Sequence, residues 1–153
     1  MKEFDYGLDY KALDFTKPDN RRKYRIGRGE QGVLLVRPYT DDICKHWRFV
    51  DEDTARKSSA TIYKMFCSYR ERKDFIGMDM ARKFLEMGFT RARRYANHSS
   101  GRKYGKNREI LPQCKDWKTN EKATAAQVFK EVRDLAAYDA IYQQMRKQWR
   151  AAE

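Results

Sequence analysis

The chain has 153 residues, of which 41% are hydrophobic and 37% are charged, and it carries a net charge of +12. This apolar content is enough for one core, so the composition excludes a disordered chain and favours a single domain over residues 1–153. The sequence contains no apolar run long enough for a membrane span or a signal peptide, and its cysteines have no paired spacing. We therefore expect a soluble, cytoplasmic protein with no disulfide framework, no metal site and no cofactor.

The N-terminal third of the chain predicts a small amount of β-structure. Apolar residues at positions 4, 6, 8 and 10 alternate with polar ones, which is the period of a half-buried strand. Residues 23–27 and 33–37 are short apolar runs on either side of a glycine-rich turn, and they predict a β-hairpin. A third short strand is expected around Trp47 and Phe49.

Helices are predicted next. Apolar residues at three- and four-residue spacing indicate amphipathic helices that cover about residues 53–72, 74–87 and 91–97. Asp51 or Asp53 is suited to cap the first of them, and Gly88 is suited to end the second. In the second helix Asp79 precedes Lys83 by four residues on the polar half, which is the spacing of a surface ion pair.

The C-terminal third predicts one long helix. A Gly/Ser/Lys/Arg-rich loop comes first, at residues 99–106, and Thr124 with Gln127 then fits a capping box that opens the helix. The predicted fold class is therefore α+β, a mostly helical single domain with a small N-terminal β-hairpin or sheet and a long C-terminal helix.

The excess positive charge is concentrated in two stretches that contain no acidic residue. Residues 20–29 hold five basic residues and residues 87–108 hold seven, which together equal the whole net charge. Because like charges repel in a folded protein, a bound anion is the natural compensation. The alternative is that acidic residues elsewhere in the fold neutralise both stretches. The expected partner is nucleic acid or another polyanion and not a membrane, with the oligomeric state left open.

The second stretch is the main candidate site. A helix there places basic and aromatic side chains opposite Ala92 and Ala96, and the following loop adds more of them between two glycines. Guanidinium groups suit phosphate oxygens, and tyrosine rings can stack on unpaired bases. The predicted nucleic-acid or phosphate-binding residues are Arg91, Arg94, Tyr95, His98, Arg102, Lys103, Tyr104 and Lys106, with Arg22 and Arg28 as a second rim. The alternative is that the tyrosines pack and the arginines pair with carboxylates.

Two familiar binding motifs are considered and disfavoured. Residues 27–32 match G-x-G-x-x-G, but a strand-like run follows where a dinucleotide fold needs a helix, and the chain is too short for a kinase. This leaves a plain hairpin loop or a lid that brings Arg28 to a phosphate. A helix-turn-helix with its turn at Gly88 is weak, because Lys83 and Phe84 occupy positions that need a buried apolar and a small residue.

Three segments are long and distinctive. They read YRIGRGEQGVLLV at 24–36, HWRF at 46–49 and MARKFLEMGFTRARRYANH at 80–98. They resemble an uncharacterised family, a domain of unknown function in small proteins of bacteria, fungi and phages. The resemblance implies that the glycine segment and the arginine-rich helix belong to one folded unit, and it implies no activity.

Three functions are compatible with these observations. The leading hypothesis is a basic nucleic-acid-binding module that contacts phosphates through the arginine-rich helix and the glycine-rich loops. The alternatives are an enzyme or sequestering protein for a small phosphorylated ligand such as a nucleotide, and an interaction module for an acidic protein partner. His46 and His98 form an acid–base pair only if both line one cleft, so enzymatic activity is left open.

Overall fold

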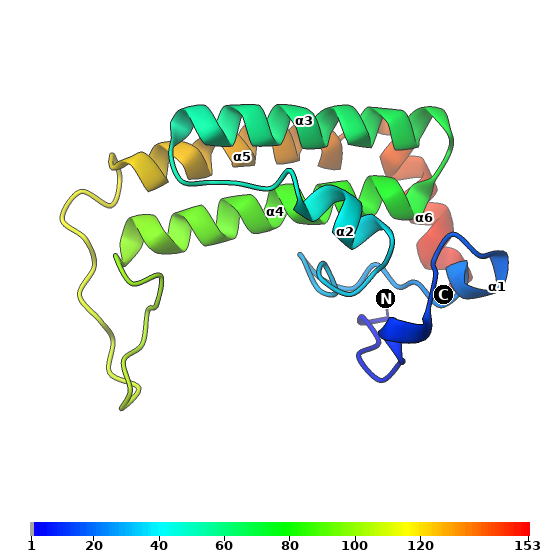
Figure 1. The fold of residues 1–153 in the computed structure, drawn as a ribbon, viewed down its shortest axis with the longest axis horizontal. Helices are drawn as coiled ribbons and strands as arrows, with labels where there is room; N and C mark the ends of the chain where they lie inside the picture. Colours follow the sequence, from blue (N-terminus) through cyan, green and yellow to red (C-terminus); the bar gives the residue numbers. More distant parts are fainter. Residues whose placement is uncertain (1) are drawn as a thin grey trace.

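The computed structural model describes residues 2–153, and over these residues the chain is helical without a β-strand (Figure 1). A 3₁₀ turn at Tyr10–Ala12 precedes six α-helices, which are α1 (Pro18–Arg21), α2 (Tyr39–Cys44), α3 (Glu52–Glu71), α4 (Phe75–Asn97), α5 (Glu121–Ala137) and α6 (Ala140–Ala152). The one extended pairing in this range is an isolated bridge between Tyr104 and Ile110. The α+β prediction, with its N-terminal hairpin or sheet, is therefore wrong.

Three long helices form the body of the molecule. A three-residue connection joins α3 to α4, and α5 packs along both of them (Figure 1). The side-chain amide of Asn120 donates to the Ala96 carbonyl (2.9 Å), and Arg133 pairs with Glu86 (2.8 Å), so α5 runs antiparallel to α4. The loop of residues 98–120 extends away from the C-terminal end of α4, and α6 lies at the opposite end. None of the helices in residues 2–153 is both long and apolar enough to cross a bilayer.

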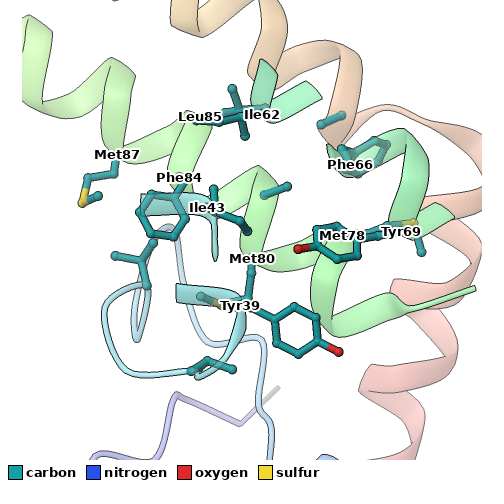
Figure 2. Close-up of a cluster of buried hydrophobic side chains, with 14 of the residues drawn as sticks. Tyr39, Ile43, Ile62, Phe66, Tyr69, Met78, Met80, Phe84, Leu85 and Met87 are labelled. Carbon is teal, nitrogen blue, oxygen red and sulfur yellow. The ribbon is translucent and has the colours of Figure 1, made fainter. Parts of the chain in front are cut away.

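The core between α2, α3 and α4 is apolar and closely packed (Figure 2). The side chains labelled there are buried and come from all three helices: Tyr39, Ile43, Ile62, Phe66, Tyr69, Met78, Met80, Phe84, Leu85 and Met87. Nearly every residue of α4 from Phe75 to Gly88 is buried, whereas only Ala92 and Ala96 are buried after it. The first part of α4 is therefore a core element, and its C-terminal part is attached to the bundle along one side.

A single helix, α4, replaces two predicted helices. It runs through Gly88 without interruption, because this glycine faces the ring of Phe129 on α5. A Cβ atom at position 88 would lie 2.3 Å from that ring. The glycine thus allows two helices to approach closely and does not end the first one. The same continuity leaves no turn for a helix-turn-helix at this position.

Consecutive turns occupy the segment that was predicted as a hairpin. The backbone N–H groups at positions 31, 33 and 35 each donate to the carbonyl three residues earlier, so the chain coils where a strand would extend. Val33 and Val36 are buried, while Leu34 is 47% exposed. Burial at a spacing of three suits a coiled segment, since a strand buries alternate residues.

The other two predicted strands are also absent from the described residues. Phe4 and Tyr10 are buried in the core and their rings stack on each other (5.4 Å between centroids), but no neighbouring strand pairs with this segment. Trp47 and Phe49 lie in an extended connection between α2 and α3. The alternation of apolar and polar residues in these segments resembles the pattern of a strand, but it arises from separate contacts between aromatic side chains.

The helix boundaries are set by side-chain caps. As predicted, Asp51 caps α3, and its carboxylate accepts a hydrogen bond from the backbone N–H three residues on (2.8 Å). The predicted capping box at Thr124 is wrong, because Asn120 caps α5 in the same way (2.9 Å). Asp139 caps a new helix (2.9 Å), so the predicted long C-terminal helix is divided into α5 and α6.

Candidate functional site

The C-terminal part of α4 carries three of the predicted binding residues on one face, and a fourth follows at its C-cap. Arg91, Arg94 and Tyr95 align along the helix because Arg91 precedes the other two by three and four residues. His98 is the C-cap residue and has an extended backbone. On the opposite side, Ala92 and Ala96 are completely buried and attach this part of α4 to the bundle. The arrangement leaves two guanidinium groups, an imidazole and a phenol ring at the surface.

A hollow of about 300 Å³ lies at this end of α4, and we call it the basic hollow. Its lining residues are Phe89, Thr90, Arg93, Arg94, Asn97, His98 and Lys103. His98 Nδ1 lies 3.1 Å from the Pro112 carbonyl, and Arg93 donates to Asn97 Oδ1 (3.1 Å) and to the Trp117 carbonyl. The basic hollow therefore unites predicted residues from α4 with Lys103 of the loop.

The loop of residues 98–120 is tied to itself and to the end of α4. The backbone N–H of Cys114 donates to the Asn97 carbonyl (2.6 Å), and that of Leu111 donates to the Lys103 carbonyl (2.7 Å). A Cβ atom at position 101 would lie 2.5 Å from the Tyr95 ring, so the loop passes directly over this tyrosine. These contacts present the other predicted loop residues at the surface, namely Arg102, Tyr104 and Lys106.

The predicted cations at this end of the molecule have no carboxylate within ion-pair distance among residues 2–153. They are Arg91, Arg94, Arg102, Lys103 and Lys106. Eight arginines elsewhere in that range are each paired with an Asp or Glu, whereas Arg22, Arg25, Arg48, Arg72 and Arg146 are not. The alternative expectation, that carboxylates neutralise these arginines, is therefore not met here. This end of α4 carries uncompensated positive charge.

A second hollow, of about 450 Å³, lies beside Tyr95, and we call it the aromatic hollow. Its lining residues are Trp47, Arg48, Phe49, Val50, Tyr95 and Lys122. The centroid of the Phe49 ring lies 5.0 Å from that of Trp47 and 5.9 Å from that of Tyr95. Lys122 Nζ lies 5.4 Å from the centroid of the Phe49 ring. Trp47 Nε1 is buried and has no hydrogen-bond partner among the described residues.

A family model described as Domain of unknown function (DUF4385) matches residues 5–152, which is nearly the whole chain. The chain belongs to the DUF4385 family. No curated protein and no solved structure matches it. The matched range includes every helix and both hollows, so the basic end of α4 is part of the DUF4385 domain and not an addition to it.

The first acid-free stretch of this DUF4385 domain begins at the start of α4 and reaches the middle of that helix at Gly29, whereas the second lies at its C-terminal end. Arg21 pairs with Asp74, the residue that caps the start of α4 (2.8 Å), and its neighbour Arg22 lines a separate hollow beside α6. Twenty residues of helix separate Asp74 from Arg94, which corresponds to about 30 Å. Arg22 is therefore far from the basic hollow and does not share a surface with it.

The glycine-rich segment at 27–32 is fastened to α4 and α6 through its carbonyl groups. Three helix cations donate to it: Arg82 to Gly29 (3.0 Å), Lys83 to Gln31 (2.7 Å) and Arg150 to Gly27 (2.8 Å). Gly32 has a φ of +77°, and a Cβ there would lie 2.1 Å from the Phe4 ring. Arg28 pairs with Glu3 at the surface (3.1 Å) and lines neither the basic nor the aromatic hollow. The glycine-rich segment thus holds Phe4 and the N-terminal residues around it in place.

The predicted pair of Asp79 and Lys83 is present, but its expected location at the surface is wrong, because both side chains are completely buried. Asp79 accepts hydrogen bonds from the hydroxyls of Tyr24 and Tyr142 (2.6 Å for Tyr142), pairs with Arg82 (2.9 Å) and lies 3.8 Å from Lys83. Burial favours a higher pKa for Asp79, but the positive charges of Arg82 and Lys83 outweigh it and lower the pKa to about 2. For Lys83, burial lowers the pKa to about 7.

Sequence reasoning missed the aromatic hollow. Trp47 and Phe49 were assigned to a strand, and Arg48 and Lys122 were assigned no role. The available signal was the HWRF segment, in which aromatic and basic residues alternate as they do at stacking sites. Lys122 belongs to α5, more than 70 residues later, and only the packing of α5 against α4 brings it to this hollow.

The described residues offer few other groups for chemistry. Residues 2–153 contain no cluster of three or more His, Cys, Asp or Glu side chains that is placed to hold a metal ion. His98 lines the basic hollow, while His46 lines neither hollow. The half-buried cysteines Cys44, Cys67 and Cys114 are free thiols. The site is therefore defined by cations and aromatic rings.

Proposed function

We propose that this DUF4385 domain binds nucleic acid through the C-terminal part of α4 and the loop of residues 98–120. The observation that carries the proposal is the group of five cations without carboxylate partners at this end of the molecule, Arg91, Arg94, Arg102, Lys103 and Lys106. Arginine is well suited to this role because its guanidinium fork matches the oxygens of a phosphate. Nucleic acid supplies such phosphates at regular intervals and would compensate the charge.

Local stabilisation of the helix accounts for only part of this charge. Cations near a helix C-terminus interact favourably with the helix dipole, by about 0.3–1 kcal/mol each, and the effect is confined to the last turn. Arg94 benefits from it, but Arg91 lies further back, and Arg102 and Lys106 lie beyond the helix in the loop. The charge of the loop therefore requires a different explanation, which a polyanionic ligand provides.

The direct test is the double substitution Arg91→Glu with Arg94→Glu. We expect the fluorescence anisotropy of a labelled oligonucleotide to show that binding is abolished in this variant. If the wild-type protein neutralises about five phosphates of duplex DNA, log K falls against log salt with a slope of roughly −4 to −5. A salt-independent affinity would contradict the proposal.

The matched control is Arg22→Glu with Arg25→Glu, which makes the same change of charge at the distant end of α4. We expect this variant to retain most of the affinity, because its altered side chains lie about 30 Å from the basic hollow. Circular dichroism of both variants checks that they are folded. Unchanged binding in the Arg91 and Arg94 variant would exclude the proposed interface, and equal losses in both variants would indicate unspecific attraction.

The two alternative functions are distinguished in the same assay. A protein for small nucleotides would bind them one-to-one with weak salt dependence, although Arg28, which was expected to complete its pocket, lies outside the basic hollow. If the domain binds an acidic protein, heparin and not nucleic acid would displace that partner.

The cytoplasm remains the proposed location, since its reducing conditions suit the free thiols.

A further inference from the structure

We infer that the aromatic hollow accommodates an unpaired nucleobase and makes the domain selective for single-stranded over duplex nucleic acid. The inference rests on the proposed function, because it specifies the ligand of the same interface. Tyr95 connects the two parts of the argument, since it lies on the arginine-bearing face of α4 and also lines the aromatic hollow.

The composition of the hollow suits a flat aromatic ligand. Three rings line it, and Phe49 lies between the other two, with centroid distances of 5.0 Å to Trp47 and 5.9 Å to Tyr95. Its volume of about 450 Å³ falls within the range of about 300–1,000 Å³ that is typical of small-ligand sites. Tyr95 is 38% exposed and Val50 is 58% exposed, so this apolar surface is open to a ligand.

The charge around the hollow favours a base that belongs to a nucleic acid strand over an apolar side chain of a protein. Arg48 and Lys122 line the hollow itself, and Arg91 precedes Tyr95 by four residues of helix, or about 6 Å. A phosphate bound at Arg91 would therefore be close to a base placed beside Tyr95. Stacking of this kind tolerates any base but requires that the base is not already paired in a duplex.

The experiment compares three probes of equal length at one salt concentration: a single strand, the same strand with abasic sites, and a duplex. We expect the single strand to bind more tightly than the abasic strand by about fivefold or more, which is the effect of stacking one base. We also expect the single strand to bind more tightly than the duplex.

The variants Tyr95→Leu and Phe49→Leu, made separately, keep apolar bulk and remove one ring each. In both we expect the affinity for the single strand to fall to that for the abasic strand, while the slope of affinity against salt is unchanged. Tyr138→Leu is the matched control, because this tyrosine is the C-cap of α5, is 77% exposed and lines neither hollow. The affinity of this variant should equal that of the wild type. If Phe49→Leu destabilises the fold, the exposed Tyr95 still provides the test.

The outcomes separate this inference from the proposed function. Equal binding of the intact and abasic strands by the wild type, with salt dependence retained, would overturn the stacking site and leave the phosphate interface standing. Tighter binding of the duplex would do the same. Loss of binding to all three probes would instead remove the proposed function and the inference together.

Discussion

Asp79 on α4 is a completely buried carboxylate at the junction of three parts of the chain. Tyr24 belongs to the N-terminal segment and Tyr142 to α6, and both donate to it, while Arg82 pairs with it from the next turn of α4. Removing one partner of a buried ionic cluster is costly because the remaining charges stay buried without compensation. This residue therefore joins α4, α6 and the N-terminal segment electrostatically.

The first residue-scale prediction concerns Asp79→Asn. We expect the free energy of unfolding at pH 7 to fall by about 3–5 kcal/mol, because Arg82 and Lys83 lose their counter-charge. Urea denaturation followed by circular dichroism measures the change. Glu71→Gln is the control, because this carboxylate at the end of α3 is exposed. Its substitution should change the free energy of unfolding by less than about 0.5 kcal/mol. A loss below 1 kcal/mol in Asp79→Asn would contradict the electrostatic role.

Lys83 gives a prediction for the pH dependence of stability. Its pKa is lowered by burial to about 7, so between pH 7 and its ordinary pKa near 10.5 the unfolded chain binds more protons at this residue than the folded one. The contribution of Lys83 to the free energy of unfolding therefore rises as the pH increases through that window. We expect the free energy of unfolding of the wild type to increase from pH 7 to pH 9.5. In Lys83→Met this increase should be absent. Lys64→Met, on the exposed face of α3, should keep the wild-type profile.

At the scale of elements, α4 shows how tertiary packing overrides local preference. Glycine destabilises a helix interior by about 1 kcal/mol relative to alanine, and Gly88 followed by an apolar residue resembles a helix end. The helix nevertheless continues, because Gly88 lets Phe129 of α5 lie against its backbone. The close approach of α4 and α5 also positions Lys122 beside the aromatic residues that precede α3.

The prediction at this scale is that Gly88→Ala destabilises the protein despite the better helix propensity of alanine. We expect a loss of about 1–3 kcal/mol, since the new Cβ would lie 2.3 Å from the Phe129 ring. Chemical denaturation of a double-mutant cycle with Phe129→Leu measures the coupling, and the loss should shrink when the ring is absent. A gain in stability on Gly88→Ala would show that propensity outweighs packing.

At the scale of the whole molecule, α4 separates structural and binding roles along its length. Its first part lies in the core, and its last turns carry the arginine-bearing face between the basic and aromatic hollows. The other acid-free stretch begins about 30 Å away, where Arg21 pairs with Asp74 at the start of the helix. The double variant at Arg22 and Arg25 is informative because it changes the net charge by the same amount as the variant at Arg91 and Arg94. Only the position of the change differs between the two variants.

Much of the local structure and charge pattern could be predicted from the sequence. The helix that begins after Asp51, the accessible face bearing Arg91 and Arg94, and the loop at 99–106 all follow from periodicity, capping and composition. These features depend on residues that are close in the chain, and local physics is sufficient for them. The balance of charge is also a property of the sequence alone, because it needs only a count of residues.

Only the tertiary structure decided the remaining features. Val33 and Val36 are buried within a series of turns, and Asp79 and Lys83 are buried on α4, because other parts of the fold cover these positions. The aromatic hollow combines the segment before α3, the end of α4 and the start of α5, which are adjacent in space and distant in sequence. Periodicity reports which side of a segment is apolar, but which elements cover it depends on long-range packing.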